Sequence, residues 1–337
     1  MTLNGRPPTL EDVARLAGVS RATASRAIIE PQKVSPERRS AVEEAMARLG
    51  YVPNAAARSL VTRRTMSIAV VVPEPTRTVF EDPFFQAAIG GINSVLVDAD
   101  YQLVLLMGDP QGQTQRVRQY LRSRLADGIV VVSHHGSDGV VETAVAAGVP
   151  TVLVGRPFSG AVHVAYSDLD NVLGGRIATR RLVEQGCSRI GILTGPLDMV
   201  GARDRYDGWR AELAQHGLTG GGIWHGDFDR ASGRAAGHEI AKAAIPLDGL
   251  FVSSDLMALG VLESLAEHGI RVPQDLKLVG FDDISLAAYH KPALTTVTNS
   301  GFDLAAAAAE LLLRQLQTGE AQAPRIIQPE LVVRESA

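Results

Sequence analysis

Residues 9–29, TLEDVARLAGVSRATASRAII, contain two short amphipathic segments separated by AGVS. Thr9 lies three residues before Asp12, the spacing of a capping-box variant, which predicts that a helix begins directly after Thr9. Gly18 supplies the positive-φ turn that ends this helix, and Ser20 is placed to cap a second one. The pattern predicts a helix-turn-helix unit of the kind that reads DNA. An ordinary helical hairpin is the alternative, which the run of small residue, glycine, apolar residue and cap disfavours.

The second segment predicts a helix with one buried and one exposed face. Ala24, Ala27 and Ile28 recur at helical spacing and are expected to pack on the first helix. The opposite face carries two arginines, and an arginine in the major groove can bind guanine through two hydrogen bonds. The residues of this helix and its cap that we expect to contact DNA are Ser20, Arg21, Ala22, Thr23, Ser25 and Arg26.

A third helix is expected to follow. Ser35, Pro36 and Glu37 form an N-cap, a first-turn proline and an early acid, and the helix that they open is expected to stop at Gly50. Residues 54–60, NAAARSL, have the composition of a further short helix, which is too short to be stable without a partner. A plain linker helix is the alternative interpretation of this stretch.

The charge of the chain is divided unevenly. Residues 1–65 hold 11 Lys and Arg against 6 Asp and Glu, a net of +5, whereas residues 66–337 hold 22 against 31, a net of −9. The overall charge of −4 would by itself argue against a nucleic-acid partner. Positive charge concentrated in the helix-turn-helix part is what contact with DNA phosphates requires.

Length and composition limit the class of protein. A chain of 337 residues that is 45% hydrophobic exceeds one ordinary domain. No apolar run is long enough to span a membrane, and Met1 to Pro8 contain no apolar signal segment, so we expect a cytoplasmic protein with no membrane partner. Cys187 is the only cysteine of the sequence, which excludes an internal disulfide and a zinc site built from several thiolates.

After residue 66 the sequence alternates between strand and helix patterns. Residues 67–73, SIAVVVP, form a β-branched run typical of a strand buried on both faces of a parallel sheet. The alternation that follows predicts two doubly wound α/β lobes. Strands are expected over 102–107, 128–132, 150–154, 190–194, 222–225, 249–252 and 277–281, and first-lobe helices over 84–99, 113–126 and 138–147. Strand-like connections near 162–166, 294–297 and 325–327 are expected to cross between the lobes, and ligands of such sheets bind in the cleft there.

Together these segments resemble the lactose-repressor/galactose-repressor (LacI/GalR) family of transcription factors over essentially the whole chain. The resemblance implies an all-α helix-turn-helix headpiece plus a periplasmic-binding-protein-like (type I) α/β core of two doubly wound lobes. It also implies that two hinge helices, each starting at Asn54, pair in the minor groove of an operator. Leu60 would then wedge between base pairs, and Ala57 would allow the two helices to approach. The expected domains are the headpiece at 1–53, the hinge at 54–65, the first lobe at 66–166 and 298–325, and the second lobe at 167–297 and 326–337.

The same resemblance places a small-molecule effector between the lobes. Arg205, in the motif GARDRYDGW, matches an arginine of the family. Its planar fork can bind vicinal hydroxyls, a carboxylate or a phosphate, and a structural ion pair is the alternative role. We expect Phe85 and Asp283 to be structural. The residues that the resemblance implies at the effector are Phe84, Arg205, Phe228, Ser254, Asp255 and Asp282.

Five positions depart from the family pattern. Ala22 stands where other members carry a longer polar side chain, and Ala24 stands in place of valine, so the operator is not expected to be a copy of a known one. In the effector region, Asp82 replaces an asparagine, Ser254 replaces a carboxamide, and Gly155 replaces an acidic residue found in some sugar binders.

The function expected from these features is that of a sequence-specific DNA-binding repressor, controlled by a sugar or sugar derivative. Two-fold pairing predicts a homodimer on a pseudo-palindromic operator, and no leucine heptads follow the strand-like stretch 330–334 to favour a tetramer. The alternatives are a regulator with a purine or anionic corepressor, and a solute-binding or sugar-converting protein on the same two lobes.

No enzyme chemistry is expected. Ser253-Ser254-Asp255 lacks the elbow motif of a serine nucleophile. His134 and His135 are adjacent and should point apart, with no third ligand at metal spacing. Glycines 220–222 lack the lysine and serine of a phosphate-binding loop, so no catalytic residue, metal or cofactor is predicted.

Overall fold

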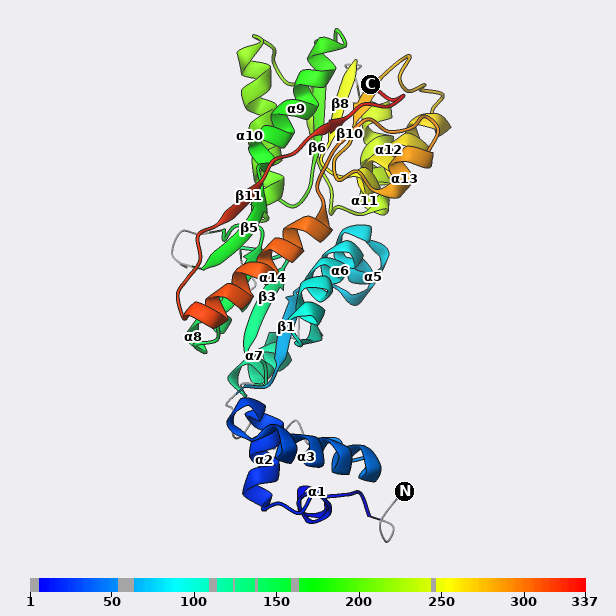
Figure 1. Ribbon diagram of the computed structural model, residues 1–337. Coiled ribbons are helices and arrows are strands. Elements are labelled where there is room, and N and C mark those ends of the chain that lie inside the picture. The colour runs from blue at the N-terminus through cyan, green and yellow to red at the C-terminus, as the bar shows by residue number, and fades with distance from the viewer. Residues whose placement is uncertain are drawn as a thin grey trace. The chain divides into compact units, whose positions relative to one another are not determined.

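A computed structural model describes residues 6–53, 64–108, 114–123, 125–136, 139–158, 164–243 and 247–337. The chain divides into two compact units, Met1–Met66 and Ser67–Ala337 (Figure 1). The hinge residues expected from the sequence, Asn54, Ala57 and Leu60, lie outside the described residues. In the parts of the chain that are described, no helix is both long enough and apolar enough to cross a membrane.

The first unit contains the three helices predicted from the sequence. They are α1 (Leu10–Leu16), α2 (Arg21–Ile29) and α3 (Pro36–Leu49), with a 3-10 turn over Pro31–Lys33. The capping box is confirmed, because the Asp12 amide donates to Thr9 Oγ1 at 3.4 Å and the Thr9 amide donates to Asp12 Oδ2 at 3.0 Å. Gly50 ends α3 in the left-handed conformation, as predicted. The small core of this unit is formed by Val13, Ala14, Ala24, Ala27, Val42 and Ala45.

The first lobe of the second unit is built on a six-stranded parallel sheet. Its strand order is β11-β5-β4-β3-β1-β2. The strands are β1 (Ser67–Val72), β2 (Gln102–Met107), β3 (Gly128–Val132), β4 (Thr151–Val154), β5 (Ala165–Leu169) and β11 (Arg325–Ile327). The late strand β11 returns to the sheet beside β5, so residues far apart in the sequence share this edge (Figure 1).

Helices cover both faces of this sheet, which explains the continuous apolar run in β1. Ile68, Val70 and Val72 pack with α6 (Pro83–Asp98) and α14 (Gly301–Thr318), which lie side by side (Figure 1). Ala69 and Val71 point to the other face, toward α7 (Thr114–Arg122) and α8 (Val140–Ala146). Because both faces are buried, the strand needs no polar side chain within its length.

The second lobe has a four-stranded parallel sheet with the order β7-β6-β8-β9. Two helices pack together on each side of it, α9 with α10 and α11 with α12. The strands are β6 (Ile190–Thr194), β7 (Ile223–His225), β8 (Gly249–Val252) and β9 (Lys277–Val279). The helices are α9 (Asn171–Glu184), α10 (Val200–Gln215), α11 (Arg230–Ala241) and α12 (Asp255–Glu267).

Short elements complete the second unit. The helix α5 (Thr76–Glu81) precedes α6, and α13 (Ser285–Tyr289) follows β9. The strands β10 (Thr296–Val297) and β12 (Leu331–Val332) pair in an antiparallel ribbon. Strand β9 ends two residues earlier than the sequence pattern predicts, and the chain beyond it turns at Asp282 and Asp283, where φ is 113° and 56°. Residues that turn out of the sheet at this point can reach a ligand.

Candidate functional site

The exposed face of α2 gathers the residues that the sequence assigns to DNA contact. Ser20 caps the helix and accepts a hydrogen bond from the Thr23 amide at 3.1 Å. Arg21, Ala22 and Arg26 are exposed, while Ala24 on the opposite side is fully buried. The remaining two residues of this set, Thr23 and Ser25, are half-buried at the edge of the same face. The face is therefore open to a groove, with two arginines five positions apart, about 1.4 helical turns.

An ion pair fixes the first of these arginines. Arg21 Nε lies 2.6 Å from Glu11 Oε1 on α1, and both side chains are more than half exposed. Such a pair in solvent contributes little to stability, on the order of 0–1 kcal/mol. The ion pair orients Arg21 at the start of α2.

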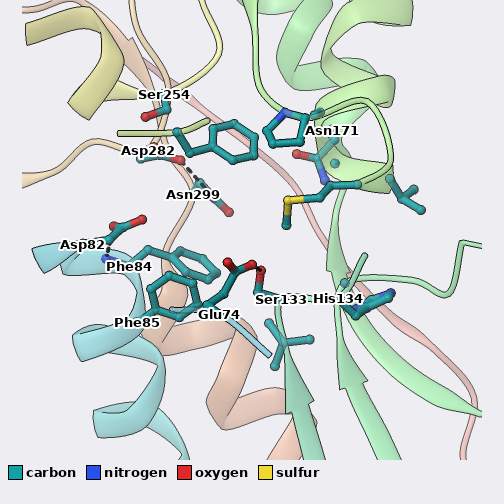
Figure 2. A pocket seen from close by; sticks show the side chains of 18 of the residues that line it. Glu74, Asp82, Phe84, Phe85, Ser133, His134, Asn171, Ser254, Asp282 and Asn299 are labelled. Atoms are coloured by element: carbon teal, nitrogen blue, oxygen red, sulfur yellow. Dashed lines mark hydrogen bonds between the residues drawn. The ribbon is translucent and has the colours of Figure 1, made fainter. Parts of the chain in front are cut away.

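A cavity of about 490 Å³ lies between the two lobes of the second unit. Loops that leave the carboxyl ends of parallel strands supply its walls, which is where α/β sheets bind ligands. In Figure 2, Asp82 and Phe84 approach from α6 of the first lobe, and Ser254 and Asp282 approach from the second lobe. The polar residues of its lining include Glu74, Asp82, Ser133, His134, His135, Arg156, Asp168, Asn171, Arg205, Asp227, Asp229, Ser254, Asp282 and Asn299.

Arg205 is held rigidly at the centre of this wall. Its Nε donates to Asn171 Oδ1 at 2.9 Å, and its Nη1 donates to the Ser253 carbonyl at 2.6 Å. Nη1 also lies 3.7 Å from Asp282 Oδ1, and the guanidinium stacks 3.8 Å from the centroid of the Phe281 ring. These contacts leave Nη2 without a hydrogen bond among the bonds found for Arg205, so it can donate to a ligand.

Asp282 is oriented by an amide side chain. Asn299 Nδ2 donates to Asp282 Oδ1 at 2.9 Å, as the dashed line in Figure 2 shows. Burial raises the pKa of Asp282, and the Arg205 guanidinium opposes that shift. Asp282 has φ of 113°, and the cavity residues Ser133 and Phe228 also have positive φ, 58° and 60°. Backbone strain of this kind, roughly 1–3 kcal/mol per residue, often marks binding sites.

Asp82 brings a second carboxyl group to the same side of the cavity. Its Oδ1 accepts a hydrogen bond from the Phe84 amide at 2.9 Å and so caps α6. Burial and the nearby Asp282 carboxylate raise the pKa of Asp82 to about 7. Burial also raises the pKa of Asp168 to about 6, against the attraction of Arg156. The cavity therefore contains carboxyl groups that titrate near neutral pH.

Three aromatic rings line the cavity, Phe84 and Phe85 from the first lobe and Phe228 from the second. Phe84 stands edge-on to Phe85, with the ring centroids 5.7 Å apart, and Phe85 is 5% exposed at the core of the first lobe. Phe228 follows β7 and lies against Gly195, where a side chain would collide with its ring at 2.1 Å. A larger residue at 195 would therefore displace the Phe228 ring from this position.

Asp255 lies outside the lining of the cavity and is fully buried. Its Oδ1 accepts from Thr296 Oγ1 at 2.7 Å and its Oδ2 accepts from the Ile284 amide at 3.1 Å. These bonds join the start of α12 to the loop after β9. Its neighbour Ser254 caps α12 and does line the cavity. Five of the six residues expected at the effector are therefore brought together, and Asp255 supports them from behind.

Several lining residues were not predicted from the sequence. Glu74, Ser133 and Asp168 lie at the ends of strands β1, β3 and β5, a position that could have indicated them. Asn299 precedes α14 and comes from a distant part of the chain, so no local pattern indicates it. His134 and His135 do diverge as expected, since His134 Nε2 contacts the Arg156 carbonyl while His135 contacts Glu74 and Asp198.

Comparison with known proteins accounts for both units. Residues 9–54 match the model for bacterial regulatory proteins of the lacI family, and residues 179–337 match a periplasmic binding protein-like domain. The transcriptional regulator CelR of Thermobifida fusca is 40% identical over 336 residues, 98% of each chain. The ribose operon repressor of Escherichia coli K12 is 33% identical over 98% of this chain and 99% of that protein.

Solved structures agree with the sequence relatives. A CelR–cellobiose complex superposes with a TM-score of 0.77 at 37% identity, over 98% of this chain and 100% of that one. The lac repressor dimer bound to operator and the anti-inducer ONPF gives a TM-score of 0.86 at 26% identity, over 98% and 99% of the two chains. A helix-turn-helix headpiece joined to a two-lobed ligand-binding core defines a DNA-binding transcriptional regulator controlled by an effector, not an enzyme. The chain belongs to the LacI family.

Proposed function

We propose that this repressor responds to a neutral sugar of more than one ring, bound between its lobes. The observation that carries this proposal is the charge of the cavity. Among the described residues of its lining are six acidic side chains, Glu74, Asp82, Asp168, Asp227, Asp229 and Asp282, against three basic ones, Arg156, Arg205 and His135, whose pKa is raised to about 9 by its hydrogen bond with Glu74. The CelR structure similar to this chain is a complex with cellobiose, a neutral disaccharide.

The arginines of the cavity are already engaged. Arg205 lies 3.7 Å from Asp282 and Arg156 lies 2.6 Å from Asp204, so neither presents an uncompensated charge. A phosphate or carboxylate ligand would enter a region of excess negative charge, which disfavours sugar phosphates and other anionic effectors. Sugar hydroxyls can donate to the carboxylates and accept from Arg205 Nη2 without this penalty.

The size and the walls of the cavity also fit a sugar. A volume of about 490 Å³ corresponds to roughly sixteen molecules of liquid water, at about 30 Å³ each, and falls within the usual range for small-molecule sites. Phe84 and Phe228 can pack against the apolar faces of sugar rings from opposite lobes. Because one ring comes from each lobe, a ligand that contacts both would favour the closed arrangement.

Calorimetry with the full chain tests this proposal. We expect cellobiose or a related oligosaccharide to bind, glucose to bind more weakly, and glucose 6-phosphate not to bind. Asp82→Asn and Asp282→Asn remove negative charge from the cavity and serve as charge controls. If the phosphorylated sugar binds more tightly than the neutral sugars, the proposed effector class is wrong.

We propose further that two copies of the chain bind a pseudo-palindromic operator, with the paired hinges in the minor groove. The lac repressor structure, a dimer on its operator, supports this arrangement. In this proposal Asn54, Ala57 and Leu60 form the hinge contact, and Leu60→Ala weakens operator binding far more than binding to random DNA. Gel-shift titrations against both kinds of DNA measure the difference. An equal loss of affinity for operator and for random DNA would show that Leu60 does not act as a wedge between base pairs.

A further inference from the structure

A histidine bridges the two lobes at one side of the cavity. His135, in the loop after β3 of the first lobe, has Nδ1 2.9 Å from Asp198 Oδ2 of the second lobe. Its Nε2 lies 3.1 Å from Glu74 Oε1, and Ser133 Oγ donates to the same oxygen at 2.7 Å. Carboxylates only accept, so both ring nitrogens donate and His135 is an imidazolium cation. A backbone bond reinforces this contact, because the Gly136 amide donates to the Asp198 carbonyl at 3.0 Å.

A second bridge lies next to the first. Arg156, in the loop after β4 of the first lobe, has Nη2 2.6 Å from Asp204 Oδ2 and 2.7 Å from Asp204 Oδ1. The Asp204 side chain is only 5% exposed. Beside it, the Arg203 guanidinium stacks 4.5 Å from the centroid of the Phe158 ring, again from one lobe to the other. We call the contacts of His135 and Arg156 with Asp198 and Asp204 the clasp.

The clasp adjoins the residue that the sequence places at the effector. Asp204 and Arg205 are consecutive residues of α10, which begins two residues after Asp198. Neither Asp198 nor Asp204 lines the cavity, whereas Arg205 does. The clasp therefore joins two residues of the cavity lining, His135 and Arg156, to two aspartates outside it, in or just before the helix that carries Arg205.

Separating the lobes would break the contacts of the clasp, which costs free energy. Asp204, whose side chain is 5% exposed in this arrangement, would lose its ion-pair partner Arg156, and loss of one partner of a buried ion pair is unfavourable. Closure is thus favoured by the clasp itself, independently of what the cavity contains. An effector that binds only the closed arrangement has an apparent Kd equal to its intrinsic Kd divided by the closed fraction.

We propose that Asp198 and Asp204 are positioning residues for the effector response, which act by holding the lobes closed and so set the apparent affinity for the effector. The proposal rests on the cavity being the effector site. It requires no particular effector, so it can be tested separately from the identity of the sugar.

Hydrogen exchange of the full chain, analysed by mass spectrometry with fragmentation to single residues, tests the clasp directly. The Gly136 amide is bonded across the lobes and therefore reports their separation. Asp204→Asn weakens the second bridge and leaves the Gly136 bond itself untouched. We expect protection of the Gly136 amide to fall by about tenfold, within the usual range of coupling between sites.

A matched control comes from an ion pair within one lobe. Asp275 pairs with Arg271 at 2.8 Å inside the second lobe, so Asp275→Asn should leave Gly136 protection unchanged. The exchanged pair Arg156→Asp with Asp204→Arg should restore protection, which a purely local role of Asp204 would not predict. If Asp204→Asn does not fold, Asp198→Asn gives the same test, since the Asp198 side chain is half exposed. Unchanged protection in the folded variants would overturn the proposal.

Calorimetry with cellobiose supplies the functional readout. In Asp204→Asn the apparent Kd should rise by the factor by which the closed fraction, calculated from Gly136 protection, falls, while Asp275→Asn binds like the unmodified chain. If cellobiose binds neither the unmodified chain nor Asp204→Asn, the proposed sugar is wrong. The exchange of the Gly136 amide then still tests whether the clasp holds the lobes together. If the closed fraction falls measurably in Asp204→Asn and cellobiose still binds all forms equally, lobe closure does not set affinity and the proposal fails.

Discussion

The guanidinium of Arg205 lies 3.8 Å above the ring of Phe281, while its Nε and Nη1 are bonded to Asn171 and Ser253. Stacking on one face and two directional bonds at the edge fix the plane of the guanidinium before any ligand arrives. A pre-oriented donor loses less conformational entropy on binding. The position of Arg205 therefore depends on its neighbours as much as on its own place in α10.

Arg205→Lys should weaken effector binding by more than tenfold. An ammonium group cannot donate to Asn171 and Ser253 together and still present a planar donor to the ligand. Operator binding without effector should stay within about twofold, because the headpiece is a separate compact unit. Parallel calorimetry and gel-shift titrations measure the two effects. A normal effector response in the Arg205→Lys variant would exclude Arg205 from the site.

Asp82 should make the stability of the second unit depend on pH. The pKa of Asp82 is raised from 3.8 to about 7, so between these values the folded protein holds a proton that the unfolded chain has released. Stability contributed by this proton is present at low pH and is lost as pH rises toward 7. We expect Asp82→Asn, which can still cap α6, to be more stable than the unmodified chain at pH 8 by about 1–2 kcal/mol. Thermal melts from pH 4 to 8 give the two curves, and parallel curves would contradict this assignment.

His135 should change stability in the same direction as Asp82, but at higher pH. Its pKa is raised to about 9, first by the hydrogen bond with Glu74 and, against the effect of burial, by Asp198. A histidine with a raised pKa stabilises the folded state fully below its ordinary value of 6.5, and this contribution is lost as pH rises through 9. Gly136 protection, corrected for intrinsic exchange, should therefore fall between about pH 7 and 10. In Asp198→Asn the loss should begin at a lower pH, and an identical profile would show that Asp198 does not affect His135.

Arg26 should contribute to the choice of operator sequence. It is exposed on α2, five positions after Arg21, and no ion pair engages it among those found in the described part of the headpiece. Arg26→Ala should cost about 1–3 kcal/mol in operator binding and relax base preference at one position of each half-site. Arg48→Ala is the matched control, because it removes the same charge from the exposed end of α3. Selection of binding sites from random DNA shows the base preference, and equal effects of both variants would indicate a phosphate contact only.

Local patterns in the sequence were sufficient for the headpiece. The cap at Thr9, the turn at Gly18 and the cap at Ser20 each depend on residues within four positions, so helix boundaries follow from them directly. The alternation of apolar strands and helices likewise predicted both lobes, because burial on two faces leaves a continuous apolar run. Single motifs further predicted that Phe84 and Arg205 would line one cavity.

Only the tertiary structure decided which of the remaining polar side chains face the cavity and which support it from behind. Ser254 and Asp255 are adjacent in sequence, yet Ser254 faces the cavity and Asp255 is bonded behind it to Thr296 and Ile284. The clasp joins His135 to Asp198, 63 positions away, and no local rule reports such a distance. Sequence determined the elements because their signals are periodic and short-range. The site and the clasp required the fold, because packing of two separate lobes is what brings their charged side chains within bonding distance.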